Sequence, residues 1–279
     1  MELNICHLYP DILNLYGDRG NIITMKRRME DRGIKVNVEG CSIGETLDAN
    51  RYDIFFIGGG QDFEQEVLLK DLGTGKAAEI RAAVEDEKTF LAICGGYQML
   101  GCGITDPDGV EEGGQIRGME LLPVRTVLQK EKHRCQTTGR LEMVEGIFSG
   151  LAGCEFAGYE IHMGQTVCCG KDGNAADVVD KAAGLTDGTA GNTEITQAII
   201  TDSTGRIYGS YIHGLFDKGE IAGRMIQTLA REKGISLENG VLEDYRTIKE
   251  RQYDQLADTL REYLHMEDIY GMLREAHIS

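Results

Sequence analysis

Two short apolar segments constrain the fold more than any other feature of the sequence. Residues 52–57 read YDIFFI and residues 89–93 read TFLAI, and a glycine-containing segment follows each of them. An apolar run without polar alternation is typical of a strand buried on both faces, as in a parallel sheet. Helical patterns separate these strands. The sequence therefore predicts an α/β fold with a mostly parallel sheet flanked by helices.

The same alternation predicts the remaining elements. Residues 101–118 and 170–192 are rich in Gly and Asp and predict loops. A helix is expected to begin at residue 95. Further strands are expected at residues 3–8, 34–38, 119–128, 139–144, 156–165, 196–201 and 206–212, and further helices at residues 21–32, 75–87, 221–233 and 243–264.

The end of the chain differs in character from the rest. Apolar residues recur at helical spacing between residues 253 and 264. We expect one α/β domain over residues 1–235 and a C-terminal helical appendage over residues 236–279 that packs on it.

Composition excludes several classes of protein. The 279 residues are 41% hydrophobic, which is typical of a globular chain. The net charge of −17 argues against a general binder of nucleic-acid backbones. No apolar run approaches the roughly 18 residues that span a membrane. Because Met1 leads directly into a strand-like segment and not into a signal peptide, we expect a cytoplasmic protein.

Eight cysteines are scattered along the chain without a C-x-x-C pair. This arrangement favours neither a zinc site nor a disulfide framework, so no metal is expected. The cysteines are expected to be free thiols in a reducing compartment, and most should be small buried residues.

Cys94 is the cysteine most suited to chemistry. It follows a buried strand and precedes Gly95 and Gly96 where a helix must begin, which is the arrangement of a nucleophile elbow. The start of a helix also favours the thiolate over the thiol. A buried structural cysteine before a glycine-rich turn is the alternative, but the strand before Cys94 and the helix after it favour a nucleophile.

A cysteine that attacks an amide needs a base and a site for the oxyanion. His213 ends an apolar strand at the sheet edge where Cys94 lies, and it is the expected base, with His162 as the second choice. Backbone N–H groups of Gly95 and Gly60 are the expected oxyanion donors. A plain turn at the end of a strand is the alternative for the Gly60 segment.

Three motifs resemble a known family. GGGQDFEQE at residues 58–66, LAICGGYQMLG at 91–101 and GSYIHGLF at 209–216 are similar to the class I, triad-type glutamine amidotransferases. The resemblance is closest to the branch that contains cobyric acid synthase and the glutaminase subunit of lipid II isoglutaminyl synthase. It implies a flavodoxin-like fold and hydrolysis of glutamine through a cysteinyl thioester. The ammonia then passes to a synthetase that activates a carboxylate with ATP.

Two members of this branch compete. Residues 7–22 (HLYPDILNLYGDRGNI) and 55–66 look like the isoglutaminyl synthase glutaminase, whereas 158–166 (GYEIHMGQT) and the tail 251–270 look like cobyric acid synthase. The first resemblance implies a heterodimer with a Mur-ligase-like synthetase that amidates D-glutamate of the lipid II stem peptide. The second implies a subunit of a cobalamin-pathway amidotransferase. The chain contains no G-x-x-x-x-G-K-[ST] sequence, so we expect no cofactor here and ATP use by the partner alone.

The resemblance also implies substrate contacts, and the chain departs from the family pattern at one position. Arg134 matches the position that binds the glutamine carboxylate, with Arg125 as the alternative, and Gln98 is expected to contact substrate or to shape the pocket. Many relatives carry Glu two residues after the histidine, where this chain has Leu215. Asp217 is the candidate third member of a triad; helix capping by Asp217 and a carboxylate supplied by the partner are the alternatives.

Two alternative interpretations assign the chain to other classes of protein. A non-catalytic regulatory subunit would be expected to lack the nucleophile, the base or an oxyanion glycine, and none is missing. A cysteine peptidase or stress-response hydrolase usually places its histidine nearer to the cysteine, whereas 119 positions separate Cys94 from His213 here (213 − 94).

Overall fold

The computed structural model describes residues 2–14, 17–60, 65–111, 113–141, 144–169, 199–217, 220–235, 237 and 245–276. The chain divides into two compact units, Met1–Glu238 and Asn239–Ser279, and each is described by itself. Packing of the C-terminal helices on the α/β domain stays a prediction.

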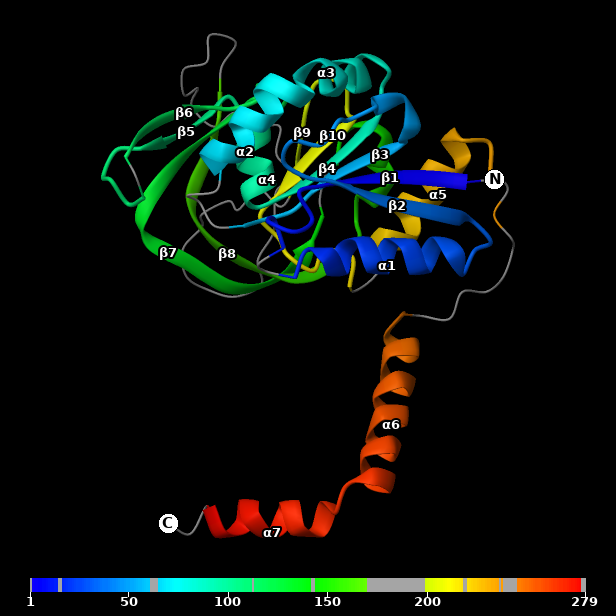
Figure 1. Cartoon of the computed structure of the whole chain (residues 1–279). Helices are drawn as coiled ribbons and strands as arrows, with labels where there is room; N and C mark the ends of the chain where they lie inside the picture. Colours follow the sequence, from blue (N-terminus) through cyan, green and yellow to red (C-terminus); the bar gives the residue numbers. More distant parts are fainter. Residues whose placement is uncertain are drawn as a thin grey trace. The chain divides into compact units, whose positions relative to one another are not determined.

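A six-stranded sheet forms the centre of the first unit (Figure 1). All of its neighbouring strands pair in parallel except β9, which is antiparallel to β10. The residues of β3 and β4 are all buried, which confirms the interpretation of the two apolar segments. In spatial order the strands are β2 (Lys35–Cys41), β1 (Glu2–Leu8), β3 (Ile54–Ile57), β4 (Thr89–Ile93), β10 (Ile207–Ser210) and β9 (Ile200–Thr201).

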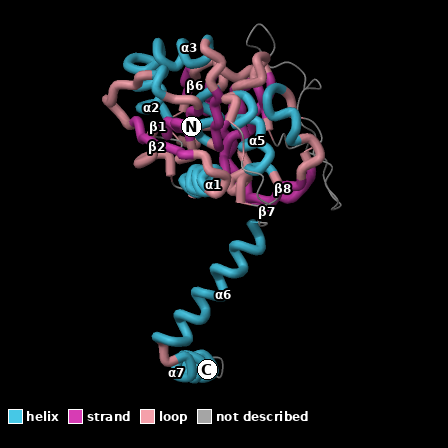
Figure 2. Tube along the Cα trace, turned by 90° about the vertical axis from the view of Figure 1, so that its right-hand side faces the viewer, coloured by secondary structure: helices cyan, strands magenta, loops and turns pink. Residues whose placement is uncertain are grey.

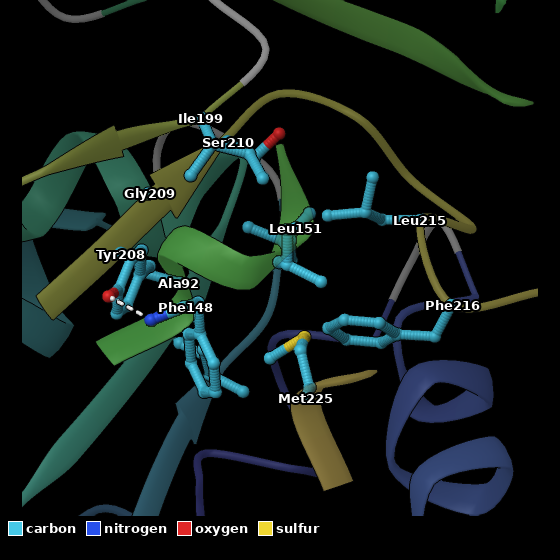
Figure 3. A pocket seen from close by; sticks show the side chains of 12 residues that line it. Ala92, Phe148, Leu151, Ile199, Tyr208, Gly209, Ser210, Leu215, Phe216 and Met225 are labelled. Atoms are coloured by element: carbon cyan, nitrogen blue, oxygen red, sulfur yellow. Dashed lines mark hydrogen bonds between the residues drawn. The ribbon is translucent and has the colours of Figure 1, made fainter. Parts of the chain in front are cut away.

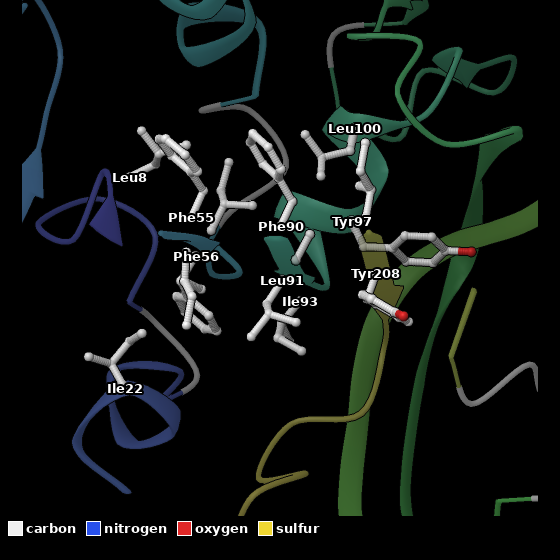
Figure 4. Close-up of a cluster of buried hydrophobic side chains, with 14 of the residues drawn as sticks. Leu8, Ile22, Phe55, Phe56, Phe90, Leu91, Ile93, Tyr97, Leu100 and Tyr208 are labelled. Carbon is white, nitrogen blue, oxygen red and sulfur yellow. The ribbon is translucent and has the colours of Figure 1, made fainter. Parts of the chain in front are cut away.

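Helices cover both faces of this sheet, as expected for buried parallel strands. One face carries α1 (Arg19–Glu30), α5 (Ile221–Glu232) and the 3₁₀ segment η4 (Gly146–Leu151); the other carries α2 (Gln65–Asp71), α3 (Ala77–Glu85) and α4 (Gly95–Leu100) (Figures 1 and 2). Two short segments, η1 (Ala49–Arg51) and the π-helical turn η3 (Leu72–Lys76), join these elements. The core between the layers includes Phe55 and Phe90, whose rings stack with centroids 4.7 Å apart (Figure 4).

A second sheet of four strands corrects part of the sequence analysis. Residues 101–118 were expected to form a loop, but they contain β5 (Gly103–Asp106) and β6 (Gly114–Arg117), which pair with each other. The Asp106 carboxylate accepts hydrogen bonds from the backbone N–H groups of Val110, Glu111 and Gly113 and so closes the turn between them. The Gly and Asp content that predicts a loop therefore belongs to a hairpin turn.

The strands expected at residues 119–128 and 139–144 are also corrected. A single strand of 17 residues, β7 (Val124–Arg140), replaces them and pairs with β8 (Glu155–Cys168). The middle of β7 is polar and exposed, so it lacks the apolar signal by which strands are recognised. Residues 170–192, expected to form a loop, lie outside the described residues.

Within its described residues, the second unit contains two helices, α6 (Tyr245–Tyr263) and α7 (Met266–Ala276). The apolar residues at helical spacing on α6 include Tyr253, Leu256 and Leu260, all of which are exposed. No helix within the described residues has the length and apolar character to cross a bilayer.

A small apolar cavity lies between the sheet and η4, with Phe148, Leu151, Phe216 and Met225 among its lining residues (Figure 3). Its volume is about 30 Å³. The surface that faces the cavity is apolar, although Tyr208 and Ser210 are among its lining residues, and such a small apolar cavity is typical of a packing void.

The tight contact between α4 and the end of β3 makes a first prediction. A Cβ atom on Gly96 would lie 2.7 Å from the Ile57 carbonyl oxygen and 2.9 Å from that of Gly58. We expect Gly96→Ala to lower the free energy of unfolding by about 1–3 kcal/mol, because backbone must move to relieve the overlap. Urea denaturation measures this change.

Gly20→Ala is the matched control. Gly20 lies in α1, where an added Cβ has no atom within 4 Å. The substitution should raise the free energy of unfolding by about 0.4–1 kcal/mol, since it restricts the unfolded chain. Equal stability of the two variants would contradict the close approach of α4 to β3.

Candidate active site

Cys94 occupies a sharp turn between β4 and α4. Its φ of +51° and ψ of −112° are unusual for a residue with a side chain, and such conformations cost on the order of 1–3 kcal/mol. The Cys94 N–H donates to the Ser210 carbonyl oxygen (2.8 Å), and the Gly96 N–H donates to the Gly58 carbonyl oxygen (3.0 Å). These bonds tie the turn to the ends of β10 and β3, and this is the backbone geometry that a nucleophile elbow requires.

His213 lies just beyond β10, and its side chain is fully buried. Tyr159 holds it in two ways. The two residues exchange backbone hydrogen bonds of 3.2 and 2.9 Å, and the Tyr159 ring stacks on the imidazole with centroids 5.1 Å apart and an interplanar angle of 13°. Strand β8 therefore fixes the position and the plane of the His213 ring.

Asp18 provides the carboxylate that orients His213. Its Oδ1 lies 2.8 Å from His213 Nδ1, and neither side chain is exposed to solvent. A carboxylate only accepts, so the imidazole donates through Nδ1 and keeps Nε2 for proton exchange. The second oxygen, Oδ2, accepts from the Gly59 N–H at 2.7 Å. One carboxylate thus holds both the imidazole and the glycine segment after β3.

Gly59 marks the point where these groups meet. A Cβ atom built on Gly59 would lie 2.9 Å from Cys94 Cβ, 3.2 Å from Asp18 Oδ2 and 3.3 Å from His213 Cε1. The three side chains therefore converge on one location, although they come from distant parts of the chain. The absence of a side chain at Gly59 is what allows their approach.

The expected oxyanion donors also lie together. A Cβ atom on Gly95 would be 3.4 Å from the Gly60 nitrogen, so the Gly60 amide and the first turn of α4 are neighbours. Gln65 Nε2, at 3.3 Å from the same Cβ position, is close as well. This arrangement suits stabilisation of a negative oxygen formed beside Cys94.

Gln98 lies beneath the elbow and is buried. Its Oε1 accepts from Gln65 Nε2 (2.6 Å), and its Nε2 donates to the Tyr211 hydroxyl (3.2 Å). Both ends of the amide are bonded within the protein, so the geometry supports the pocket-shaping role. Direct contact of Gln98 with a substrate stays a prediction.

Strand β8 also places backbone against the cysteine. Cys94 Sγ lies 3.7 Å from the Ile161 carbonyl oxygen, and Ile161 pairs with Arg134 across the β7–β8 ladder. Arg125, the alternative, pairs with Val167 farther along the same ladder. The register of the β7–β8 ladder therefore favours Arg134 over Arg125 as the residue expected to bind the glutamine carboxylate. Arg134 is exposed and lies opposite Ile161, the residue that contacts Cys94.

His162, the second-choice base, points elsewhere. Its ring stacks on Tyr211 with centroids 3.7 Å apart, and its two nitrogens face the Gly164 carbonyl oxygen and Glu160.

Burial raises the pKa of the Tyr211 phenol far above its usual range. The pKa of Tyr159 is also raised, first by burial and then by the charges of Asp18 and Asp217. Both phenols beside the site therefore stay neutral at physiological pH.

Comparison with known proteins agrees with this geometry. The CobB/CobQ-like glutamine amidotransferase domain matches residues 4–221. The chain belongs to this family. It is 42% identical over 206 residues to cobyric acid synthase of Lachnoclostridium phytofermentans, a match that covers 72% of this chain and 39% of that relative. The chain thus spans about two fifths of the length of that relative.

Two further comparisons extend this result. The GatD subunit of lipid II isoglutaminyl synthase (glutamine-hydrolyzing) of Streptococcus pneumoniae is 31% identical over 234 residues, which cover 83% of this chain and 82% of that one. The solved structure of PurLQS from Thermotoga maritima contains a chain that is similar with a TM-score of 0.54 at 18% identity, covering 84% of this chain and 100% of that chain. At 18% identity, this structural similarity is evidence for a shared fold alone. The chain is a glutamine amidotransferase domain, and the expected fold class is confirmed.

The geometry corrects one expectation about this amidotransferase. Asp217 was the candidate partner of His213, but the Nδ1 atom of His213 faces Asp18. Asp217 follows His213 closely, and its backbone N–H closes a turn on the Gly214 carbonyl oxygen. Asp18 was missed because 195 positions separate it from His213, and no local pattern marks it. The segment 7–22 that carried the family resemblance contains it, which was the one available signal.

The two carboxylates can be separated by experiment. Asp18→Asn should lower kcat for glutamine hydrolysis by about 10²–10⁴-fold, because the amide no longer holds the imidazolium that forms during catalysis. Asp217→Asn, its matched control, should stay within a few-fold of the wild type. Ammonia release measures both, and a larger loss in Asp217→Asn would contradict the assignment.

Arg134→Ala tests the expected substrate contact on the β7–β8 ladder. Loss of a charge-assisted hydrogen bond costs about 1.5–3 kcal/mol, so the KM for glutamine should rise roughly 10- to 100-fold with kcat little changed. Steady-state kinetics measures the change. Arg125→Ala tests the alternative, and Arg140→Ala, at the far end of β7 and paired with Glu155, serves as a control. An unchanged KM in Arg134→Ala would exclude this role.

Proposed function

We propose that this chain is a glutaminase that hydrolyses L-glutamine to glutamate and ammonia and delivers the ammonia to a separate ATP-dependent synthetase. The observation that carries the proposal is the convergence of Cys94, His213 and Asp18 at Gly59. A nucleophile, a base and an orienting carboxylate within one buried site are the requirements of thiol-dependent amide hydrolysis.

The reaction proceeds in two halves. The Cys94 thiolate attacks the carboxamide carbon of glutamine, and the N–H groups of Gly60 and Gly95 stabilise the oxyanion. His213 takes up the thiol proton and gives it to the leaving nitrogen, so ammonia departs and a γ-glutamyl thioester remains. Water, deprotonated by His213, then attacks the thioester, and glutamate and the thiol are released.

The favoured synthetase is a Mur-ligase-like partner that amidates D-glutamate of the lipid II stem peptide. Similarity to the GatD subunit over 82% of that protein's length supports this choice. In this proposal the partner alone uses ATP, the chain itself needs no cofactor for glutamine hydrolysis, and the two form a heterodimer. The cytoplasm is the proposed compartment.

A second candidate is the amidation of a cobyric acid precursor by a cobyric acid synthase-like enzyme. The higher identity of 42% to cobyric acid synthase favours it. Both candidates share the glutaminase chemistry and differ in the acceptor that receives ammonia. A non-catalytic regulatory subunit is disfavoured, because a nucleophile, a base and an orienting carboxylate all converge in the site.

Cys94→Ala tests the chemistry directly. Without the thiol, ammonia release from glutamine should fall by about 10³-fold or more, since no covalent intermediate forms. Circular dichroism confirms that the variant folds. Cys169→Ser, which removes a partly exposed thiol, should keep wild-type activity.

The acceptor is tested by mixing the wild-type chain with a Mur-ligase-like synthetase, ATP and lipid II. Stimulated ammonia release together with amidated lipid II supports the favoured partner. Amidation of a cobyrinic acid substrate by a cobyric acid synthase-type synthetase, without activity on lipid II, would favour the second candidate. Wild-type glutaminase activity equal to that of Cys94→Ala in both mixtures would exclude the proposed chemistry.

A further inference from the structure

Four electron-pair donors lie on one face of the β7–β8 hairpin. His133 and Cys135 are two residues apart on β7, and Glu160 and His162 are two residues apart on β8. The ladder pairs His133 with His162 and Cys135 with Glu160. Because alternate residues of a strand point to the same side, the four side chains form a compact rectangle.

The ligating atoms of this rectangle are close together. His133 Nε2 lies 3.1 Å from Cys135 Sγ and 3.9 Å from Glu160 Oε2, and all three atoms lie within 4.8 Å of one another. His162 Nε2 lies 3.3 Å from the same Glu160 oxygen. In a tetrahedral zinc site with bonds of about 2.0–2.3 Å, ligand atoms are about 3.3–3.7 Å apart. The distances from His133 to Cys135 and to Glu160 bracket this range, whereas His162 lies outside the group of three atoms and next to its carboxylate.

The hydrogen bonds of His162 orient it as a ligand. The Gly164 carbonyl oxygen, 2.7 Å from Nδ1, can only accept, so Nδ1 carries a proton. In a neutral imidazole Nε2 then has a lone pair directed at the Glu160 carboxylate. Two acceptors at 3.3 Å repel unless a proton or a cation lies between them. A carbonyl that fixes the tautomer of a histidine is a common feature around metal ligands.

Glu160 adds a second, independent observation. Its side chain is only 2% exposed, and a carboxylate so deeply buried needs compensation. The Thr137 hydroxyl donates to Oε1 at 3.0 Å, which leaves Oε2 directed at the two histidines. His133 is 49% exposed, so an ion has a path to the site from solvent.

We propose that the clustered donors His133, Cys135 and Glu160 bind a divalent cation of the zinc class, that His162 becomes the fourth ligand when its side chain moves toward the ion, and that the ion thereby clamps β7 to β8. A thiolate with two imidazoles and one carboxylate suits Zn²⁺ and not Mg²⁺ or Ca²⁺, which prefer oxygen ligands. No metal was expected from the sequence, because the chain contains no C-x-x-C pair. The ligands are instead spaced i, i+2 on two paired strands, and only the ladder register brings them together.

The clamp encloses two positions of the candidate active site. Arg134 lies between His133 and Cys135, and Ile161, whose carbonyl contacts Cys94, lies between Glu160 and His162. A bound ion would hold these two residues at a fixed separation. The consequence for glutamine binding rests on the proposed function, whereas the binding of the ion does not.

Titration of the metal-free, full-length protein with Co²⁺ tests the site, because a tetrahedral cobalt–thiolate centre gives intense visible and ligand-to-metal charge-transfer absorption. We expect one Co²⁺ per chain, displacement by Zn²⁺ but not by Mg²⁺, and release of protons on binding. Cys135→Ser should abolish the charge-transfer band. His133→Ala should weaken Zn²⁺ binding by at least the roughly 10–100-fold that loss of an outer-shell partner costs.

Two matched controls decide which thiol binds. The band should persist in Cys169→Ser and in Cys94→Ala, since neither residue belongs to the rectangle. A band that survives in Cys135→Ser but disappears in Cys94→Ala would place the ion on the catalytic thiol and overturn the proposal. Absence of any thiolate band in folded wild-type protein would also overturn it, and neither result depends on glutaminase activity.

Activity provides the second readout. With Zn²⁺ bound at one equivalent, the KM for glutamine should be lower than in the metal-free protein, and Cys135→Ser should lose this difference. Cobalt binding without any change in KM would keep the metal site and exclude its effect on Arg134. Glutamine hydrolysis by metal-free protein tests the proposed function separately.

Discussion

The hydrogen bond between Asp18 and His213 is the interaction on which the candidate site depends. It joins the first residue before α1 to the end of β10 across the carboxyl edge of the sheet, in a region closed to solvent. The low polarity of that region strengthens the bond and makes an unpaired partner costly. Because Asp18 also accepts a hydrogen bond from the Gly59 N–H, one carboxylate ties the imidazole to the glycine segment after β3.

The parallel sheet explains why this arrangement is possible. Strands β1, β3, β4 and β10 run in the same direction, so their carboxyl ends meet at one edge. Asp18 comes after β1, Gly59 after β3, Cys94 after β4 and His213 after β10. Ligands of open α/β sheets bind at such edges, and here the edge brings together a thiol, an imidazole and the carboxylate that is bonded to it.

The β7–β8 hairpin completes the site from outside the main sheet. Through Tyr159 it stacks on His213, and through the Ile161 carbonyl it contacts Cys94. The proposed metal clamp lies on the flanking residues of the same strands. The proposed substrate contact, the proposed ion site and the observed orientation of the imidazole thus share one ladder of paired residues.

The sequence alone determined the fold class, the turn at Cys94 between a strand and a helix, and the place of His213 at the same sheet edge, because apolar strands followed by glycines are local signals that burial dictates. It did not determine the partner of His213. Asp217 was close in sequence, but Asp18 is close in space. Nor did it predict β5 and β6, whose Gly and Asp residues suit loops as well as tight turns, or the grouping of His133 with Glu160. Only the tertiary structure decided these contacts, since strand order and ladder register bring together residues that the sequence leaves far apart.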